Sequence, residues 1–222
     1  MDILKETVLG AALIGGGLAA SPLMAYEAGD FIARAGWAHV APDTDSDAFS
    51  NFPGAKAEVD DTDSLGLTFS YLLTDNIGVG ILAAYPFETD IEGDGSISAV
   101  DKVGDTKFLP PTVTLQYHFN TGTNFHPYVG AGLNYTYFWD ENASDAPFNG
   151  SNLNLDNSWG FAGEVGLDYT LKNDYLISAQ VWYINIETEA DSSGAAGNPA
   201  LAGAADVDIN PWVFMLGVGK KF

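Results

Sequence analysis

The sequence FHPYVGAGLNYTYFW at residues 125–139 alternates two kinds of side chain from Val129 onward. Every second residue is Val, Ala, Leu, Tyr, Tyr and then Trp, and four of the five residues between them are Gly, Gly, Asn and Thr. A repeat of two is that of a β-strand with two different faces. Three aromatic rings end the apolar face, and such rings favour a membrane–water interface. The stretch therefore predicts a β-strand with one side against lipid.

Similar alternating segments recur along the chain and are separated by turns or polar stretches, as in membrane barrels. They lie at residues 31–41, 64–73, 77–87, 108–119, 125–139, 158–171, 175–186 and 209–222. An even number of strands lets the sheet close with both termini on one side, and closure removes the strand edges that lipid cannot satisfy. We expect an all-β fold, an eight-stranded antiparallel transmembrane β-barrel with up-and-down meander order.

The connections between these segments alternate in length. Residues 74–76, 120–124 and 172–174 are tight turns, whereas four long loops cover 42–63, 88–107, 140–157 and 187–208. Short periplasmic turns and long external loops are typical of outer-membrane barrels. The four loops hold 22 of the 30 acidic residues, so we expect the negative charge outside the membrane as a solvated surface.

The composition excludes several classes of protein. A net charge of −22, with only 8 lysines and arginines, excludes a nucleic-acid partner because phosphates need basic clusters. The absence of cysteine excludes disulfides and thiolate metal sites. No cofactor is expected.

Residues 1–25 resemble a secretory signal peptide. Lys5 lies in a short first region, an apolar stretch runs over residues 8–20, and Ala25 precedes a more polar segment. The alternative is a membrane anchor, but the apolar stretch is shorter than the roughly 20 residues that a spanning helix needs. We expect cleavage after Ala25 and a barrel over residues 26–222.

The aromatic residues of the segments form two belts, as expected at the two membrane interfaces. The belt near the turns comprises Phe31, Tyr71, Tyr117, Phe119, Phe125, Tyr169, Tyr175 and Phe222. The belt near the loops comprises Trp37, Tyr85, Phe87, Tyr137, Trp139, Trp159, Tyr183 and Trp212. Outer-membrane lipid is therefore an expected partner.

Several segments together resemble the outer membrane protein W (OmpW) family, which includes the alkane-uptake protein AlkL. They are LPPT at 109–112, PYVGAGLNY at 127–135, SWG at 158–160 and PWVFMLGVG at 211–219. The resemblance covers essentially the whole of residues 26–222. It implies an eight-stranded barrel with a narrow, rather hydrophobic interior, and passive passage of small hydrophobic compounds across the outer membrane.

The inward-facing residues sort by height into an apolar upper half and a polar lower half. The expected upper path for solute is Leu82, Ala84, Phe108, Phe138, Trp182, Ile184, Ile209 and Val213. The expected polar plug on the periplasmic side is Arg34, Gln116, His118, Glu164, Asp168 and Gln180. A buried ion network between Arg34 and the acids Glu164 and Asp168 would close the floor.

Since the floor is closed, a solute entering from above needs another exit. Prolines lack the N–H that a sheet requires and favour edges or gaps. Pro86, Pro110 and Pro111 occupy the upper parts of neighbouring strands, so we hypothesise a lateral opening between them. The alternative is that these prolines simply end the hydrogen-bonded strands near the rim.

The sequence disfavours two other kinds of function and leaves one alternative open. An enzyme pairing Glu164 with Asp168 is disfavoured, because four residues along a strand separate them by about 13 Å. A metal site at His39, His118 and His126 is weaker still, because barrel histidines more often serve as hydrogen-bonded fillers. The main alternative is a closed structural or receptor barrel whose acidic external loops bind a partner.

Overall fold

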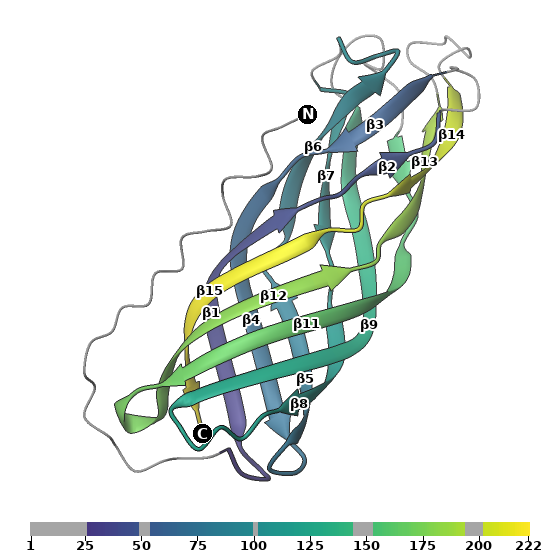
Figure 1. The fold of residues 1–222 in the computed structure, drawn as a ribbon. Coiled ribbons are helices and arrows are strands. Elements are labelled where there is room, and N and C mark those ends of the chain that lie inside the picture. The colour runs from purple at the N-terminus through teal and green to yellow at the C-terminus, as the bar shows by residue number, and fades with distance from the viewer. Residues whose placement is uncertain (1–25, 49–53, 100–101, 144–152, 194–201) are drawn as a thin grey trace.

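The computed structural model describes residues 26–48, 54–99, 102–143, 153–193 and 202–222. Over these residues the chain is a closed, eight-stranded antiparallel barrel (Figure 1), which confirms the predicted fold. The barrel strands are β1 (Phe31–Ala41), β4 (Thr62–Leu72), β5 (Ile77–Ala84), β8 (Thr112–His118), β9 (Phe125–Ala143), β11 (Ser158–Thr170), β12 (Tyr175–Ile184) and β15 (Trp212–Lys221). Within the same ranges there is no helix with the length and apolar character needed to cross a membrane.

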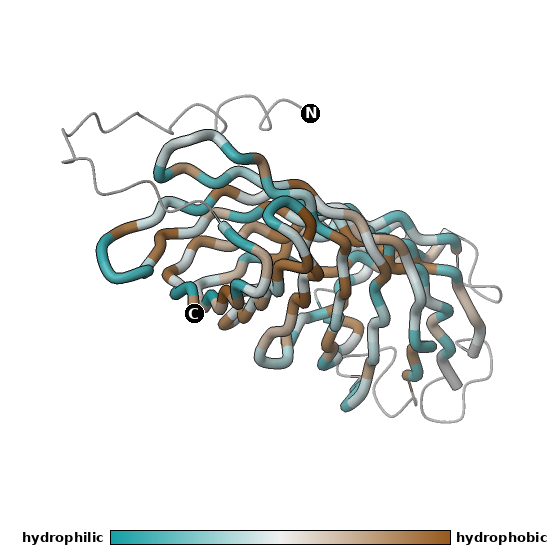
Figure 2. Tube along the Cα trace, turned by 90° about the horizontal axis from the view of Figure 1, so that it is seen from below, coloured by the Kyte–Doolittle hydropathy of each residue, from teal (hydrophilic) through white to brown (hydrophobic). Residues whose placement is uncertain are grey.

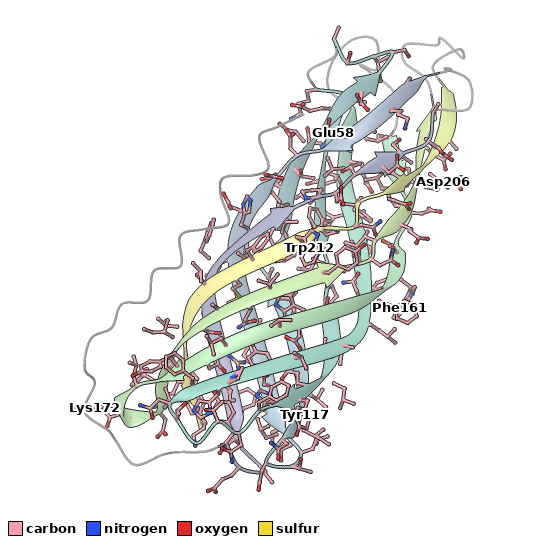
Figure 3. The ribbon with its side chains drawn as sticks, viewed as in Figure 1. Glu58, Tyr117, Phe161, Lys172, Asp206 and Trp212 are labelled. Atoms are coloured by element: carbon pink, nitrogen blue, oxygen red, sulfur yellow. The ribbon has the colours of Figure 1, made fainter. Side chains whose placement is uncertain are left out.

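The strands pair in chain order and the last returns to the first. β1 pairs with β4 on one side and with β15 on the other. Backbone bonds join the two ends: the N–H of Phe31 donates to the carbonyl of Phe222 at 3.1 Å, and the N–H of Phe222 donates back at 2.8 Å. The short connections, including the 3-10 turn η1 (Lys172–Asp174), gather at the end that carries Lys172 and Tyr117 in Figure 3.

The alternation of outward and inward side chains that the sequence predicts is present in the structure. On β8, Leu115 is 61 % exposed while its neighbours Thr114 and Gln116 are buried, and β15 repeats the pattern with exposed Leu216 beside buried Met215. Apolar and polar residues follow one another along the barrel strands in Figure 2. Because the exposed set is the apolar one, the outer surface of the membrane-spanning part is suited to hydrocarbon.

Phe87 is an exception to the predicted belts, and its assignment to the lipid-facing side was wrong. Tyr85 is 72 % exposed, but Phe87 is only 3 % exposed and points inward. The predicted strand at 77–87 is in fact two strands: β5 ends at Ala84 and β6 (Phe87–Gly95) begins after Pro86. Since proline cannot donate to the ladder, the pairing stops here and the alternation restarts one residue out of step.

Much of the sequence predicted as loops is also strand, so that prediction was wrong. Seven further strands continue the walls above the membrane-spanning part: β2 (Asp45–Ser46), β3 (Ala55–Val59), β6 (Phe87–Gly95), β7 (Gly104–Leu109), β10 (Leu153–Leu155), β13 (Glu187–Ser193) and β14 (Ala202–Asp208). Glu58 and Asp206 mark this upper region in Figure 3. On β6, β13 and β14 the acidic side chains alternate with small or apolar residues and threonines that face inward.

The upper region consists of two facing sheets. β3, β6 and β7 are hydrogen-bonded to the barrel through β9, whereas β10, β13, β14 and β2 form a separate four-stranded sheet. In the described residues the two sheets are joined at their edges by side-chain bonds, such as the Ala57 N–H donating to Ser46 Oγ at 3.3 Å. At the other edge the Phe138 N–H donates to Asn157 Oδ1 at 3.1 Å. Their apolar inner faces enclose the upper lumen.

Candidate functional site: an apolar chamber above a charged floor

A cavity lies between the two upper sheets. Of the residues predicted to line the upper path, Phe108, Phe138 and Ile209 do line it. Leu82, Trp182, Ile184 and Val213 pack beneath it in the same apolar cluster, and Ala84 packs against that cluster. The other lining residues include several that were predicted as loop, among them Ile91, Leu155, Ala190 and Val207. Their alternation with acids is the signal that would have identified them.

The wall of this chamber presents apolar groups even where threonines line it. Thr89 donates its hydroxyl to the backbone carbonyl of Asp60 at 2.8 Å, and Thr188 donates to that of Asp156 at 2.7 Å. Thr106 bonds more weakly, to the carbonyl of Lys107 at 3.3 Å. Each hydroxyl is thus occupied by the main chain. A solute in the chamber therefore meets methyl groups and aliphatic or aromatic side chains.

The chamber is narrow and has no open path downward. Its free volume is about 40 Å³, so a solute the size of an alkane can enter only if side chains move. Trp182 is 1 % exposed and, with Ile184, fills the lumen below. A straight axial passage is therefore closed in this conformation.

The floor is built on a buried ion pair between β1 and β11. Arg34 donates from Nε to Asp168 Oδ1 at 3.0 Å and from Nη2 to Oδ2, while its Nη1 donates to Ser70 Oγ at 2.9 Å. Both charged side chains are fully buried. The guanidinium lies 5.2 Å from the centre of the Tyr128 ring. A fork-shaped pairing of this kind holds both charges in fixed positions.

The other residues of the predicted plug are also inside the lumen, and Glu164, Gln116 and His118 form a second network. Glu164 does not share the hydrogen bonds of the ion pair: its Oε1 accepts from Thr114 and from Gln116 Nε2, the latter at 2.8 Å. His118 contacts the amide oxygen of Gln116 at 3.2 Å. The remaining member, Gln180, donates to Thr68 and Ser178.

One residue of the floor was missed by the sequence analysis. Tyr26 is buried, its hydroxyl donates to Asp168 at 2.9 Å, and its ring stacks on His126 with centroids 4.3 Å apart. It also meets the edge of His118, so it stands between the two histidines. No pattern marked it, because it precedes the first strand and joins the lumen only through the folded structure.

The prolines flank a break in the sheet. β5 pairs with β8 up to Leu82 and Thr112, and pairing resumes between Phe87 of β6 and Phe108 of β7. Among the described residues, segments 83–86 and 109–111 have no backbone pairing to each other, and we call them the unpaired interval. Their outer neighbours still hold them: the N–H of Tyr85 donates to Leu65, and Pro111 accepts from Tyr135.

The outer face of the four-stranded sheet carries acids in register. Asp45, Asp208 and Glu187 are direct partners across three strands. Partial burial, followed by these like-charged neighbours, raises the pKa of Asp208 above its ordinary value. Among the residues that the structure describes, no group of three or more acids and histidines is arranged to hold a metal ion. Like charges directly opposite one another destabilise a sheet, so this face costs folding energy.

A closed barrel with an apolar exterior, aromatic belts and a polar plugged lumen defines an outer-membrane β-barrel. The comparisons specify it further: residues 27–222 match the OmpW family. The chain is 44 % identical to outer membrane protein W of Vibrio cholerae over 99 % of this chain and 100 % of that one. It is 41 % identical to OprG of Pseudomonas aeruginosa, whose crystal structure superposes with a TM-score of 0.82 over 89 % of this chain and 97 % of that one.

A more distant relative is the dibenzothiophene metabolism operon protein PahQ of Pseudomonas aeruginosa, 28 % identical over 91 % of this chain and 93 % of that one. The chain belongs to the OmpW family, as its motifs predicted, and lies in the bacterial outer membrane in contact with lipid. Members of this family are barrels without enzymatic activity.

Proposed function

We propose that this protein is a passive channel for small hydrophobic molecules of the alkane kind. Solute enters the apolar chamber from outside and leaves sideways into the membrane through the unpaired interval. The observation that carries the proposal is the chamber wall, where threonine hydroxyls are turned to the main chain so that only apolar groups meet a solute. A water-filled pore would instead be polar throughout its length.

The closed floor supports the lateral route. Leaving downward would require a hydrophobic molecule to displace the Arg34–Asp168 pair and the Tyr26 ring. Leaving through the unpaired interval breaks no backbone hydrogen bond between 83–86 and 109–111, because the described residues show none there. The name of the relative PahQ, which places that protein in an operon for metabolism of an apolar aromatic compound, agrees with this class of solute.

A disulfide across the interval tests the route. Continuing the β5–β8 register past Leu82 and Thr112 places Ala84 opposite Pro110. The double variant Ala84→Cys, Pro110→Cys should abolish n-octane uptake when oxidised and recover it when reduced. Uptake is measured in cells that depend on this protein for entry, as the rate of octanol formation by an alkane hydroxylase behind the outer membrane. Unchanged uptake in the oxidised protein would contradict lateral exit.

The matched control is the pair Ile81→Cys, Val113→Cys, which are register partners just below the interval. Both side chains face lipid and their strands are already hydrogen-bonded, so a disulfide there should leave uptake unchanged. The upper lumen is tested separately by Leu82→Glu and Ile184→Glu. Each places a carboxylate in a dry, apolar site and should lower uptake.

A receptor role is the second candidate, favoured by the registered acids on β2, β13 and β14. Such a face suits a positively charged partner. If no hydrophobic solute passes in either redox state of the Ala84–Pro110 variant or in the wild type, the receptor role is the better description.

Residues 1–25 are proposed to be a signal peptide that is removed after Ala25. Tyr26 is buried in the floor and belongs to the folded barrel, which agrees with a cleavage that leaves Tyr26 on the mature chain. The intact mass of protein purified from outer membranes measures the cleavage site directly.

A further inference from the structure

Three phenylalanines form a row at the base of the chamber. Phe87 on β6, Phe108 on β7 and Phe138 on β9 are register partners across three adjacent strands. All three are buried. The ring centres of Phe87 and Phe108 are 5.3 Å apart, and those of Phe108 and Phe138 are 6.1 Å apart. The row is thus one continuous aromatic ledge on the inner wall.

This ledge separates the chamber from the unpaired interval. On β6 and β7 the other lining residues of the chamber, such as Thr89 and Thr106, lie on the far side of the row. The interval begins at the next residues in the opposite direction, Pro86 and Leu109. A solute moving from the chamber to the interval must therefore pass the rings.

The position of the row also lets its rings move. Phe87 and Phe108 form the last residue pair of the β6–β7 ladder, and the backbone beyond them is unpaired between the two strands. A ring at the end of a ladder can rotate toward the unpaired side without breaking backbone bonds there. Movement is needed, because the chamber's free volume of about 40 Å³ is smaller than an alkane.

We propose that the row Phe87–Phe108–Phe138 sets the size limit of the solutes that leave through the unpaired interval. The inference rests on the proposed channel function and adds its selectivity-determining residues. A linear chain passes the ledge by displacing one ring at a time. A rigid bicyclic molecule of similar carbon number needs several rings to move at once and is retarded.

The test compares the uptake of labelled n-decane and labelled decalin by cells that carry the protein, after subtraction of uptake by cells that lack it. Phe87→Ala and Phe108→Ala should each raise the ratio of decalin to n-decane uptake about tenfold, since steric differences of this kind in an apolar site change rates by at least that factor. Phe87→Trp should lower the ratio. Phe108→Leu keeps a bulky apolar side chain and should raise it less, which provides a milder variant if either alanine variant fails to fold.

Phe161→Ala is the matched control. Phe161 lies on β11 with its ring on the outer face of the barrel, where it is 75 % exposed. Its removal deletes the same aromatic ring without touching the chamber or the ledge, so the ratio should stay at the wild-type value. An equal rise in Phe161→Ala, or no rise in the phenylalanine variants of the row, would overturn the proposal.

Failure of the proposed function gives a different result. If the lateral route is wrong, the oxidised Ala84→Cys, Pro110→Cys protein takes up n-decane as fast as the wild type. If the protein is not a channel, the wild type takes up neither solute. If the oxidised Ala84→Cys, Pro110→Cys protein takes up no n-decane, the lateral route holds. If the ratio of decalin to n-decane uptake then does not respond to the phenylalanine substitutions, only the proposed size limit is wrong.

Discussion

Replacing Arg34 with methionine should destabilise the barrel by about 3–5 kcal/mol, because it leaves a buried carboxylate without its counter-ion. Arg34 donates to Asp168 from both Nε and Nη2 and to Ser70 from Nη1, and both ionic side chains are excluded from water. After the substitution, Asp168 keeps only neutral donors such as the Tyr26 hydroxyl, and these do not balance a buried charge. Ser70→Ala removes a single bond to the guanidinium and should cost about 1.5–3 kcal/mol.

The assay is equilibrium unfolding in urea of protein refolded into phospholipid vesicles, followed by fluorescence of the 5 tryptophans. The double variant Arg34→Met, Asp168→Leu removes both charges and should be less destabilised than Arg34→Met alone, since a matched apolar pair carries no unpaired ion. A loss of less than about 1 kcal/mol for Arg34→Met would refute the reasoning. So would a double variant as unstable as the sum of its single variants.

Three further predictions concern the outer sheet, a close contact and the chain end. Asp208→Asn should stabilise the protein at pH 7 by less than about 1 kcal/mol. The pKa of Asp208 is raised in the folded state, so its charge costs stability at neutral pH; the gain should vanish in urea titrations as pH falls toward the unfolded value of about 3.9. Gly166→Ala should cost about 1–3 kcal/mol in the same unfolding assay, because its Cβ would lie 2.1 Å from the Tyr128 ring, whereas Gly163→Ala meets no atom within 4 Å and should be tolerated. Deleting Phe222 removes the outermost pair of backbone bonds between the first and last strands and should reduce the heat-modifiable, folded fraction in outer membranes, which Phe222→Tyr should preserve.

The membrane-spanning part of the fold was predictable because one physical rule dominates it. Lipid outside and a packed lumen inside force alternation, so the predicted strand at 31–41 coincides with β1 and the start of β9 is also correct. The upper strands were missed because their outer face is solvated and acidic rather than apolar. In residues 187–190, acids alternate with Thr and Ala, which is a strand signal only if solvent is expected on one side.

The candidate site was predictable in kind but not in arrangement. Inward positions and their heights follow from alternation, so Arg34 and Asp168 could be placed in one lumen. Which carboxylate pairs with Arg34 depends on the stagger of the strands across the barrel. No local sequence pattern predicts that stagger. The same limit applies to Phe87: Pro86 predicts a break, but not that the alternation restarts out of step after it. Tyr26 lies outside every strand, so its place in the floor came only from the structure.

The length of β9 has a consequence for where the barrel operates. Its 19 residues extend about 60 Å along the strand, roughly twice what a tilted strand needs to cross hydrocarbon. The chamber belongs to the half that projects beyond the aromatic belt near the loops, outside the hydrocarbon layer. A solute following the proposed route would thus cross the polar outer layer of the membrane within the protein. It would then enter the hydrocarbon core of the membrane through the unpaired interval. The protein therefore shields the solute from the polar, hydrated layer outside the hydrocarbon, where an apolar molecule is least soluble.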